Sequence, residues 1–196
     1  RLRDTLTINV TRFYRNPETW EALRTSVLPG LWAARQGRVA VWSAGCASGE
    51  EPYTIAMLLA ECAREAGHPD WIDRLHVDAT DIDRQSLHRA SEARYRADAV
   101  AELPATLADR YLLREGEECR VAPAIRRRVA VSRVDLGSSP PLRASYDLIL
   151  CRNVVIYFDR AVQERLFLTF ASRLAPGGVL VLGKVETLLG PARNQL

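Results

Sequence analysis

The chain has 196 residues, of which 47% are hydrophobic, and a formal net charge of +3, which are ordinary values for one globular domain with a sizeable core. No apolar run approaches the roughly 18 residues of a membrane span, and we expect no signal peptide. The four cysteines form no C-x-x-C pair and the three histidines are scattered, which argues against a metal site and favours a cytoplasmic protein without membrane insertion.

Predicted helices and strands alternate along the first half of the chain. A helix is expected from about Pro17, with Asn16 as its N-cap, and Pro29 should interrupt its pattern. Further along, the apolar patterns predict strands at 38–44 and 73–83 and helices at 52–67, 84–95 and 103–112.

The second half begins with two short β-like runs around a proline-containing turn, between residues 117 and 136. Strands are then predicted at 146–151 and 178–187, with a helix at 160–178 between them. Apolar strands that alternate with helices favour a doubly wound parallel sheet with helices on both faces. Ligands of such sheets lie beyond the carboxyl ends of the strands. The distinctive loops that fall there are 44–52, Asp81, Asp135 and 152–157.

The turn "WSAGCASGEEPYTIAM", Trp42–Met57, joins a strand to a helix and is rich in small residues. It contains neither the G-x-x-x-x-G-K-[ST] pattern of a phosphate loop nor the G-x-G-x-x-G pattern of a dinucleotide site. Glu50 and Glu51 would repel a pyrophosphate and suit a ligand with a cationic end or with hydroxyl and amino donors. The alternative is that the two acids only stabilise the start of the helix through its dipole.

A second acidic position follows the next predicted strand, in "DATDID". An acid at the place of Asp81 commonly accepts hydrogen bonds from ribose hydroxyls, whereas Asp83 suits the N-cap of the following helix better. Acids at both strand ends, without a phosphate cradle, point to S-adenosylmethionine, which has a ribose, an adenine, an ammonium and a sulfonium but no phosphate.

Four motifs carry a resemblance to a known family: "TINVTRFYRNP" (7–17), the turn at 42–57, "ATDIDRQSLHRA" (79–90) and "YDLILCRNVVIYFD" (146–159). With "LAPGGVLVLGKVETL" (174–188), they span nearly the whole chain. The chain resembles the catalytic domain of the CheR-type chemotaxis receptor glutamate O-methyltransferases. That resemblance implies a mostly parallel, Rossmann-like class I sheet of S-adenosylmethionine-dependent methyltransferases with a small inserted antiparallel β subdomain.

The resemblance also implies a division of the chain. Residues 1–16 would be a linker that covers the cofactor, residues 17–196 the methyltransferase domain, and about 112–134 the inserted β subdomain. The family's N-terminal helical domain and its final sheet strands are expected to be absent from this sequence.

Cofactor-binding positions follow from the resemblance where the motifs match. The covering segment would contribute Asn9, Thr11 and Arg15, and Asp81 would bind the ribose. The family usually has asparagine-leucine where this chain has Asp135 and Leu136, and an aspartate there can accept from the adenine amino group but cannot donate. The remaining matched positions are Glu51, Asn153 and Val154.

The implied reaction is attack of a glutamate carboxylate on the sulfonium methyl group, which leaves S-adenosyl-L-homocysteine. A carboxylate is ionised at neutral pH, so no strong base is needed and catalysis should rest on alignment. Arg15 would hold the substrate carboxylate and Tyr157 would orient it. The alternative is that Arg15 binds only cofactor and Tyr157 is packing. Cys151 ends an apolar strand and is expected to be a core residue.

The partners implied by the resemblance are the glutamate-bearing cytoplasmic helices of chemoreceptors. A receptor tail peptide would add a strand to the β subdomain, and "IRRRV" (125–129) would attract an acidic helix or, alternatively, only protect a strand edge. A monomer that binds no nucleic acid is expected. Two other functions stay open: a CheR-like module that acts on a non-chemoreceptor protein, and a non-catalytic module that only binds the cofactor.

Overall fold

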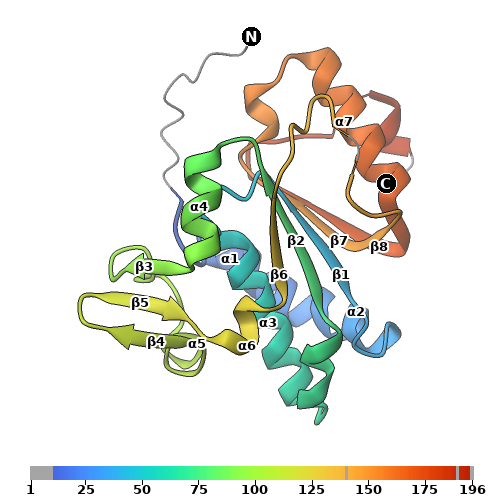
Figure 1. Ribbon diagram of the computed structural model, residues 1–196. Helices are drawn as coiled ribbons and strands as arrows, with labels where there is room; N and C mark the ends of the chain where they lie inside the picture. Colours follow the sequence, from blue (N-terminus) through green and yellow to red (C-terminus); the bar gives the residue numbers. More distant parts are fainter. Residues whose placement is uncertain (1–10, 140, 189, 195–196) are drawn as a thin grey trace.

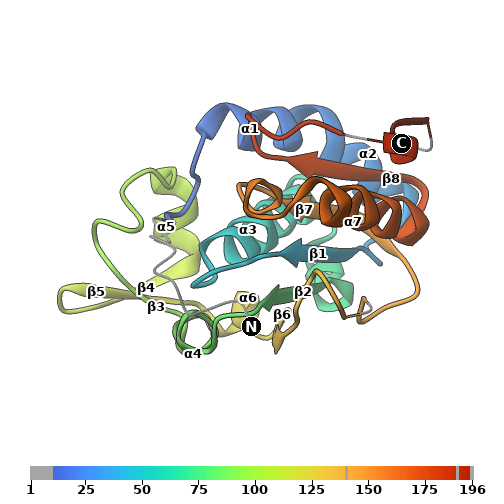
Figure 2. The same cartoon turned by 90° about the horizontal axis from the view of Figure 1, so that it is seen from above.

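The computed structural model describes residues 11–139, 141–188 and 190–194. Its centre is a five-stranded sheet with the order β6-β2-β1-β7-β8, in which every neighbouring pair is parallel. Figure 2 shows these strands side by side, from β8 at one edge to β6 at the other. The strands are β1 (Ala40–Ala44), β2 (His76–Asp81), β6 (Val129–Arg133), β7 (Tyr146–Cys151) and β8 (Leu174–Leu182).

The two central strands are almost wholly apolar because helices cover both of their faces. All six residues of β7 are buried, as are the last four of β1. Along β1 the side chains alternate: Val41 belongs to one core cluster, and Trp42 and Ala44 belong to the other. This continuous burial explains why the strands were predictable as short apolar runs.

The first face of the sheet is covered by α3 (Glu50–Glu65), which has thirteen buried residues. Beside α3 lie α1 (Pro17–Ala22) and α2 (Leu28–Ala34), which share one core cluster with Val179 and Val181 of β8, and α4 (Arg84–Glu92) packs beside β2 and β6. The second face is covered by α7 (Arg160–Arg173), whose Leu166, Phe167 and Phe170 pack with Trp42. Helices on both faces of a parallel sheet confirm the predicted fold class (Figure 1).

A small antiparallel sheet projects beside α4 (Figure 1), with the strand order β3-β5-β4. It combines β3 (Arg94–Arg96), β4 (Leu112–Glu115) and β5 (Glu118–Val121), and α5 (Ala105–Tyr111) and α6 (Pro123–Arg126) flank it. The structure therefore divides residues 112–134 differently from the predicted insertion. β6 joins the main sheet because Val129 and Val131 pack into its core.

Local differences from the predicted elements have identifiable causes. The first helix begins at Pro17 as predicted, but Asn16 has φ 62° and its side chain makes no capping hydrogen bond. The pattern breaks near Pro29, where a π-helical turn, Leu23–Val27, precedes α2. The helix predicted over 84–95 ends at Glu92, because Ala93 adopts the left-handed conformation and β3 follows.

Two of the three arginines in 126–128 have structural partners. Arg126 Nη2 donates to the Ser91 carbonyl oxygen at 2.6 Å, and Arg128 pairs with the Asp73 carboxylate and also donates to its carbonyl oxygen. These contacts tie α6 and the start of β6 to the body of the domain. They weaken the expectation that this segment is a surface patch for an acidic helix.

A buried carboxylate links α3 to α5. Glu61 is 7% exposed and accepts hydrogen bonds from Arg64, Tyr111 and Arg110. Burial alone would raise its pKa, but these hydrogen bonds together lower the pKa from 4.5 to about 2.

We expect Glu61→Gln to remove a pH-dependent part of the free energy of unfolding. Since the folded pKa lies below the unfolded value, Glu61 stabilises the fold above pH 4.5 and this stabilisation is lost as the pH falls towards 2. Urea unfolding from pH 7 to pH 3 measures it: the gap between the wild-type chain and the variant should shrink as the pH falls. A constant gap over that range would contradict this assignment.

Candidate functional site

The candidate residues gather where β1, β2, β6, β7 and β8 end. The turn after β1 begins at Gly45, which has φ 85°, and the backbone N–H groups of Gly45 and Cys46 both donate to the Thr80 carbonyl oxygen of β2. A Cβ on Gly45 would lie 2.4 Å from Val154 Cγ2, so only glycine lets the loop after β7 approach this turn. The ends of β1, β2 and β7 therefore form one packed edge.

Asp81 is held in a fixed orientation at the end of β2. Its Oδ2 accepts from the backbone N–H of Ala47 at 2.8 Å, and its Oδ1 accepts from that of Asp83 at 2.9 Å. A carboxylate has about four lone-pair sites, so these two hydrogen bonds leave acceptor capacity for hydroxyl groups. Asp83 caps α4 by accepting from the N–H groups of Gln85 and Ser86, which confirms its predicted capping role.

The two glutamates of the turn have different partners. Glu50 is 4% exposed and accepts from the Ser48 hydroxyl at 2.9 Å and from the Thr11 side chain. Glu51 Oε1 accepts from the Ser43 hydroxyl at 2.8 Å. Burial raises the pKa of both carboxyl groups. For Glu51, the nearby charge of Arg152 opposes that rise.

Arg152 connects Glu51, in the turn after β1, to the covering segment. Its side chain is 4% exposed, and its Nη1 lies 3.6 Å from Glu51 Oε2. Its Nη2 donates to the Arg15 carbonyl oxygen at 2.9 Å and to Asn16 Oδ1 at 3.1 Å, and the guanidinium lies 5.0 Å from the centre of the Trp20 ring. Sequence reasoning did not select Arg152, although a charged residue directly after a buried strand was an available signal.

The covering segment is described from Thr11 onward, so the predicted site residue Asn9 lies outside the described residues. The Arg15 side chain is exposed, and its charge, like that of Arg152, opposes the rise that burial causes in the pKa of Glu51. The structure thus brings Thr11 to Glu50, and Arg15 to the surroundings of Glu51 and Arg152.

The loop after β7 carries the remaining matched positions. Asn153 has φ 60°, and the N–H groups of Asn153 and Val154 donate to the two carboxylate oxygens of Glu186 at 2.9 and 2.8 Å. Tyr157 lies in the 3-10 turn Val155–Tyr157 and is 63% exposed, so its ring is not part of the core.

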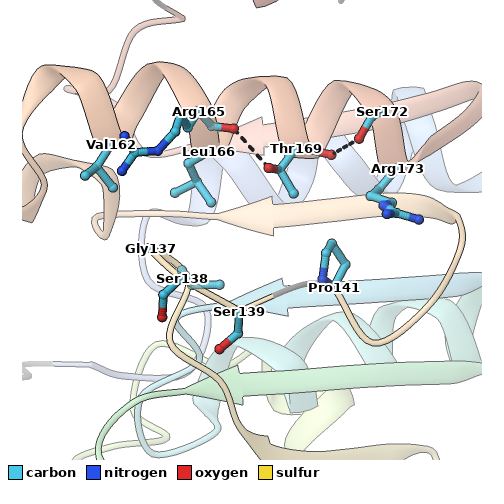
Figure 3. Close-up of a pocket in the computed structure, with 11 residues that line it drawn as sticks. Gly137, Ser138, Ser139, Pro141, Val162, Arg165, Leu166, Thr169, Ser172 and Arg173 are labelled. Carbon is cyan, nitrogen blue, oxygen red and sulfur yellow. Dashed lines mark hydrogen bonds between the residues drawn. The ribbon is translucent and has the colours of Figure 1, made fainter.

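The loop after β6 is closed by Asp135, which accepts from Gly137 N at 3.0 Å and from the Ser138 hydroxyl at 2.9 Å. Leu136 lines a cavity of about 410 Å³ between this loop and α7 (Figure 3). Of the predicted site residues that the structure describes, only Leu136 lines that cavity, and the side chains of Arg165 and Arg173 lie near its two ends. The cavity adjoins the candidate site but is not its centre.

Cys151 and Cys46 are buried, and burial raises the pKa of each thiol well above its ordinary value. Cys151 packs in the core cluster under α7, which confirms its predicted structural role. Over the described ranges, no group of three or more His, Cys, Asp or Glu side chains lies close enough to hold a metal ion. In the same part of the chain, no helix is both long and apolar enough to cross a membrane.

Comparisons with known proteins agree with the motifs. Residues 9–195 match the family model described as "CheR methyltransferase, SAM binding domain". Two curated proteins named "Chemotaxis protein methyltransferase" are similar: one from Listeria monocytogenes, 36% identical over 187 residues, and one from Borreliella burgdorferi, 34% identical over 195. The aligned regions cover 95% and 96% of this chain and 68% of each relative.

A third relative is a larger protein. An uncharacterized 104.1 kDa protein of Rhodobacter capsulatus is 35% identical over 190 residues, which cover 96% of this chain but only 20% of that protein. A sequence similar to this one therefore also occurs as one part of a much longer chain.

Proposed function

Because the chain belongs to the CheR methyltransferase family by its match over residues 9–195, we propose that it methylates glutamate side chains of chemoreceptors with S-adenosylmethionine. The family match is the observation that carries this proposal. The named relatives from Listeria and Borreliella support the chemotaxis assignment.

The residues at the strand ends fit S-adenosylmethionine. Asp81 offers free acceptor sites for ribose hydroxyls, and the turn after β1 presents Glu50 and Glu51 instead of a phosphate cradle. We assign the cofactor to Asp81, Glu51 and the loop residues Asn153 and Val154, with Asp135 and Leu136 at the adenine. Asn9, Thr11 and Arg15 would close the site from the covering segment.

S-adenosylmethionine, when bound, supplies an electrophilic methyl group on its sulfonium. A substrate glutamate carboxylate would accept this methyl group, with a new O–C bond formed as the S–C bond breaks, which would give a methyl ester and S-adenosylhomocysteine without a proton transfer. The protein's task is to align the two reactants. Arg15 would orient the carboxylate through paired donors, and the exposed Tyr157 hydroxyl would donate a further hydrogen bond.

The proposed partner is a glutamate-bearing receptor helix, bound by a monomer of this chain. The small sheet is the place for a receptor tail peptide, because its order leaves β3 and β4 as edge strands among the described residues. Leu113 of β4 is 48% exposed and would offer an apolar contact to an added strand.

A second candidate function is a methyltransferase module that serves another signalling protein. The relative of 104.1 kDa favours it, because the matching part makes up only 20% of that protein. A module that binds the cofactor without catalysis is a further form of this alternative.

Methyl-labelled S-adenosylmethionine distinguishes these functions. Purified chemoreceptor fragments should acquire base-labile label, as methyl esters do, and replacing the receptor glutamates by alanine should abolish it. Label on another protein instead would support the second candidate. Cofactor binding without any transfer would support the non-catalytic module.

We expect Asp81→Ala to weaken S-adenosylhomocysteine binding by about 1.5–3 kcal/mol, the range for hydrogen bonds to a charged group. Asp83→Ala is the matched control, since that carboxylate is occupied by the N-terminus of α4 and should affect stability rather than binding. Titration calorimetry of both variants tests the assignment, with NAD as a ligand that should not bind. Equal losses of affinity would show that Asp81 is not specifically the ribose acceptor.

A further inference from the structure

Glu186 lies four residues beyond the end of β8, and its carboxylate accepts four backbone hydrogen bonds. Oε1 accepts from the N–H groups of Val154 and Val155, both at 2.8 Å, and Oε2 accepts from those of Asn153 at 2.9 Å and Gly183 at 2.6 Å. Four donors fill the lone-pair sites of a carboxylate. Glu186 therefore acts on the site through the backbone and not by contact with a ligand.

The three consecutive N–H groups of 153–155 point at one anion, which is the geometry of a backbone nest. Asn153 has φ 60°, a left-handed conformation that residues other than glycine seldom adopt, although asparagine tolerates it better than most. Charge-assisted hydrogen bonds are about twice as strong as neutral ones. The carboxylate thus stabilises the left-handed conformation of this loop through three charge-assisted hydrogen bonds.

Gly183 is a second observation in support, because its lack of a side chain lets the Glu186 carboxylate pack closely against the backbone of Asn153. A Cβ at Gly183 would lie 2.7 Å from Glu186 Oε2 and 2.8 Å from Asn153 N. Contacts that short are not tolerated, so no larger residue fits while the carboxylate is in place. On the other side of the loop, Val154 packs against Gly45. The carboxylate therefore links the ends of β8 and β7, and through Val154 the turn after β1.

We propose that Glu186 is a positioning residue for cofactor binding: its carboxylate fixes the 153–155 loop so that Asn153 and Val154 meet the cofactor. This inference rests on the proposed function, because it takes the ligand that binds at the 153–155 loop to be S-adenosylmethionine.

Glu186→Gln tests the inference with almost no change in size. A glutamine presents one acceptor oxygen, and its amide donors face backbone donors, so at least two of the four hydrogen bonds are lost. We expect the affinity for S-adenosylhomocysteine to fall at least tenfold by calorimetry. Glu92→Gln, on an exposed carboxylate of α4, is the matched control and should change nothing.

Two further measurements separate positioning from general destabilisation. Without ligand, hydrogen exchange at the amides of Asn153, Val154, Val155 and Gly183 should accelerate selectively in Glu186→Gln. Leu75→Ala removes buried volume at the opposite end of β2 from Asp81, so it should lower stability without changing affinity or those four amides.

Two results would overturn the inference. One is a loss of affinity for S-adenosylhomocysteine of less than tenfold in Glu186→Gln, and the other is an equal loss of affinity in Leu75→Ala. Failure of the wild-type chain to bind S-adenosylhomocysteine would instead overturn the proposed function. The two failures are distinguishable because only the first leaves wild-type binding intact.

Discussion

Arg152→Met is expected to lower the free energy of unfolding by about 3–5 kcal/mol, the cost of removing one partner of a buried ion pair. Methionine keeps an apolar stem against Trp20 but cannot pair with Glu51 or donate to the Arg15 carbonyl oxygen. The variant therefore leaves one carboxylate and one carbonyl group buried with fewer partners. Urea unfolding at pH 7 measures the loss.

The pH dependence of this loss identifies its source. Burial raises the pKa of Glu51 and Arg152 opposes the rise, so the folded pKa should rise further in the variant. A carboxyl group with a raised folded pKa destabilises the fold as the pH rises through that pKa. The loss in the free energy of unfolding that Arg152→Met causes should therefore be smaller at pH 5 than at pH 8. Adding Glu51→Gln to the variant should recover part of that loss.

Arg160→Met is the matched control. Arg160 forms an i,i+4 pair with Glu164 on α7, and its side chain is 79% exposed, so its loss should change stability by less than about 0.5 kcal/mol. A deficit in Arg152→Met as small as this would show that the covering segment is not held through Arg152.

Four of the main-sheet strands and most helices were predictable because the signals are local. The last strand was misplaced: β8 begins at Leu174, inside the helix predicted over 160–178, and β3 and β4 were not predicted. β1 and β7 are apolar runs that helices cover on both faces. The helix predicted over 84–95 was too long because its periodicity continues through Tyr95. Tyr95 instead contacts residues that are distant in the sequence. Its hydroxyl donates to the Ser48 carbonyl oxygen at 2.7 Å, and its ring packs on Phe13. A local pattern holds no information about such contacts.

The same limit applies to the candidate site. Asp81 was predictable because an acid at the carboxyl end of a buried strand marks the ligand edge of a parallel sheet. Arg152 follows β7 directly and Glu186 lies four residues after the end of β8, but their roles depend on pairings with residues far along the chain. A single sequence gives the position of a charge and not the partner that the fold brings to it.

Arg15→Ala is expected to reduce turnover by about a hundredfold, the loss that misalignment of reactants can cause, and to reduce cofactor affinity by a much smaller factor. The fold around Arg15 should persist in the variant, because Trp20 and Arg152 donate to its main-chain carbonyl oxygen, which alanine also has. The variant then loses the exposed Arg15 side chain beyond Cβ, including the charge that acts on Glu51. Arg15→Lys should rescue turnover partly, because an ammonium cannot present two parallel donors to one carboxylate.

Tyr157→Phe is the companion variant, since it removes one hydroxyl from an exposed ring and should lower turnover by a smaller factor. Single-turnover methyl transfer to a receptor fragment, paired with calorimetry of S-adenosylhomocysteine, measures chemistry and binding separately. If affinity and turnover fall by the same factor in Arg15→Ala, Arg15 binds only the cofactor. If Tyr157→Phe also keeps full turnover, alignment does not depend on either side chain, and the rate must come from holding the carboxylate and the methyl group close together.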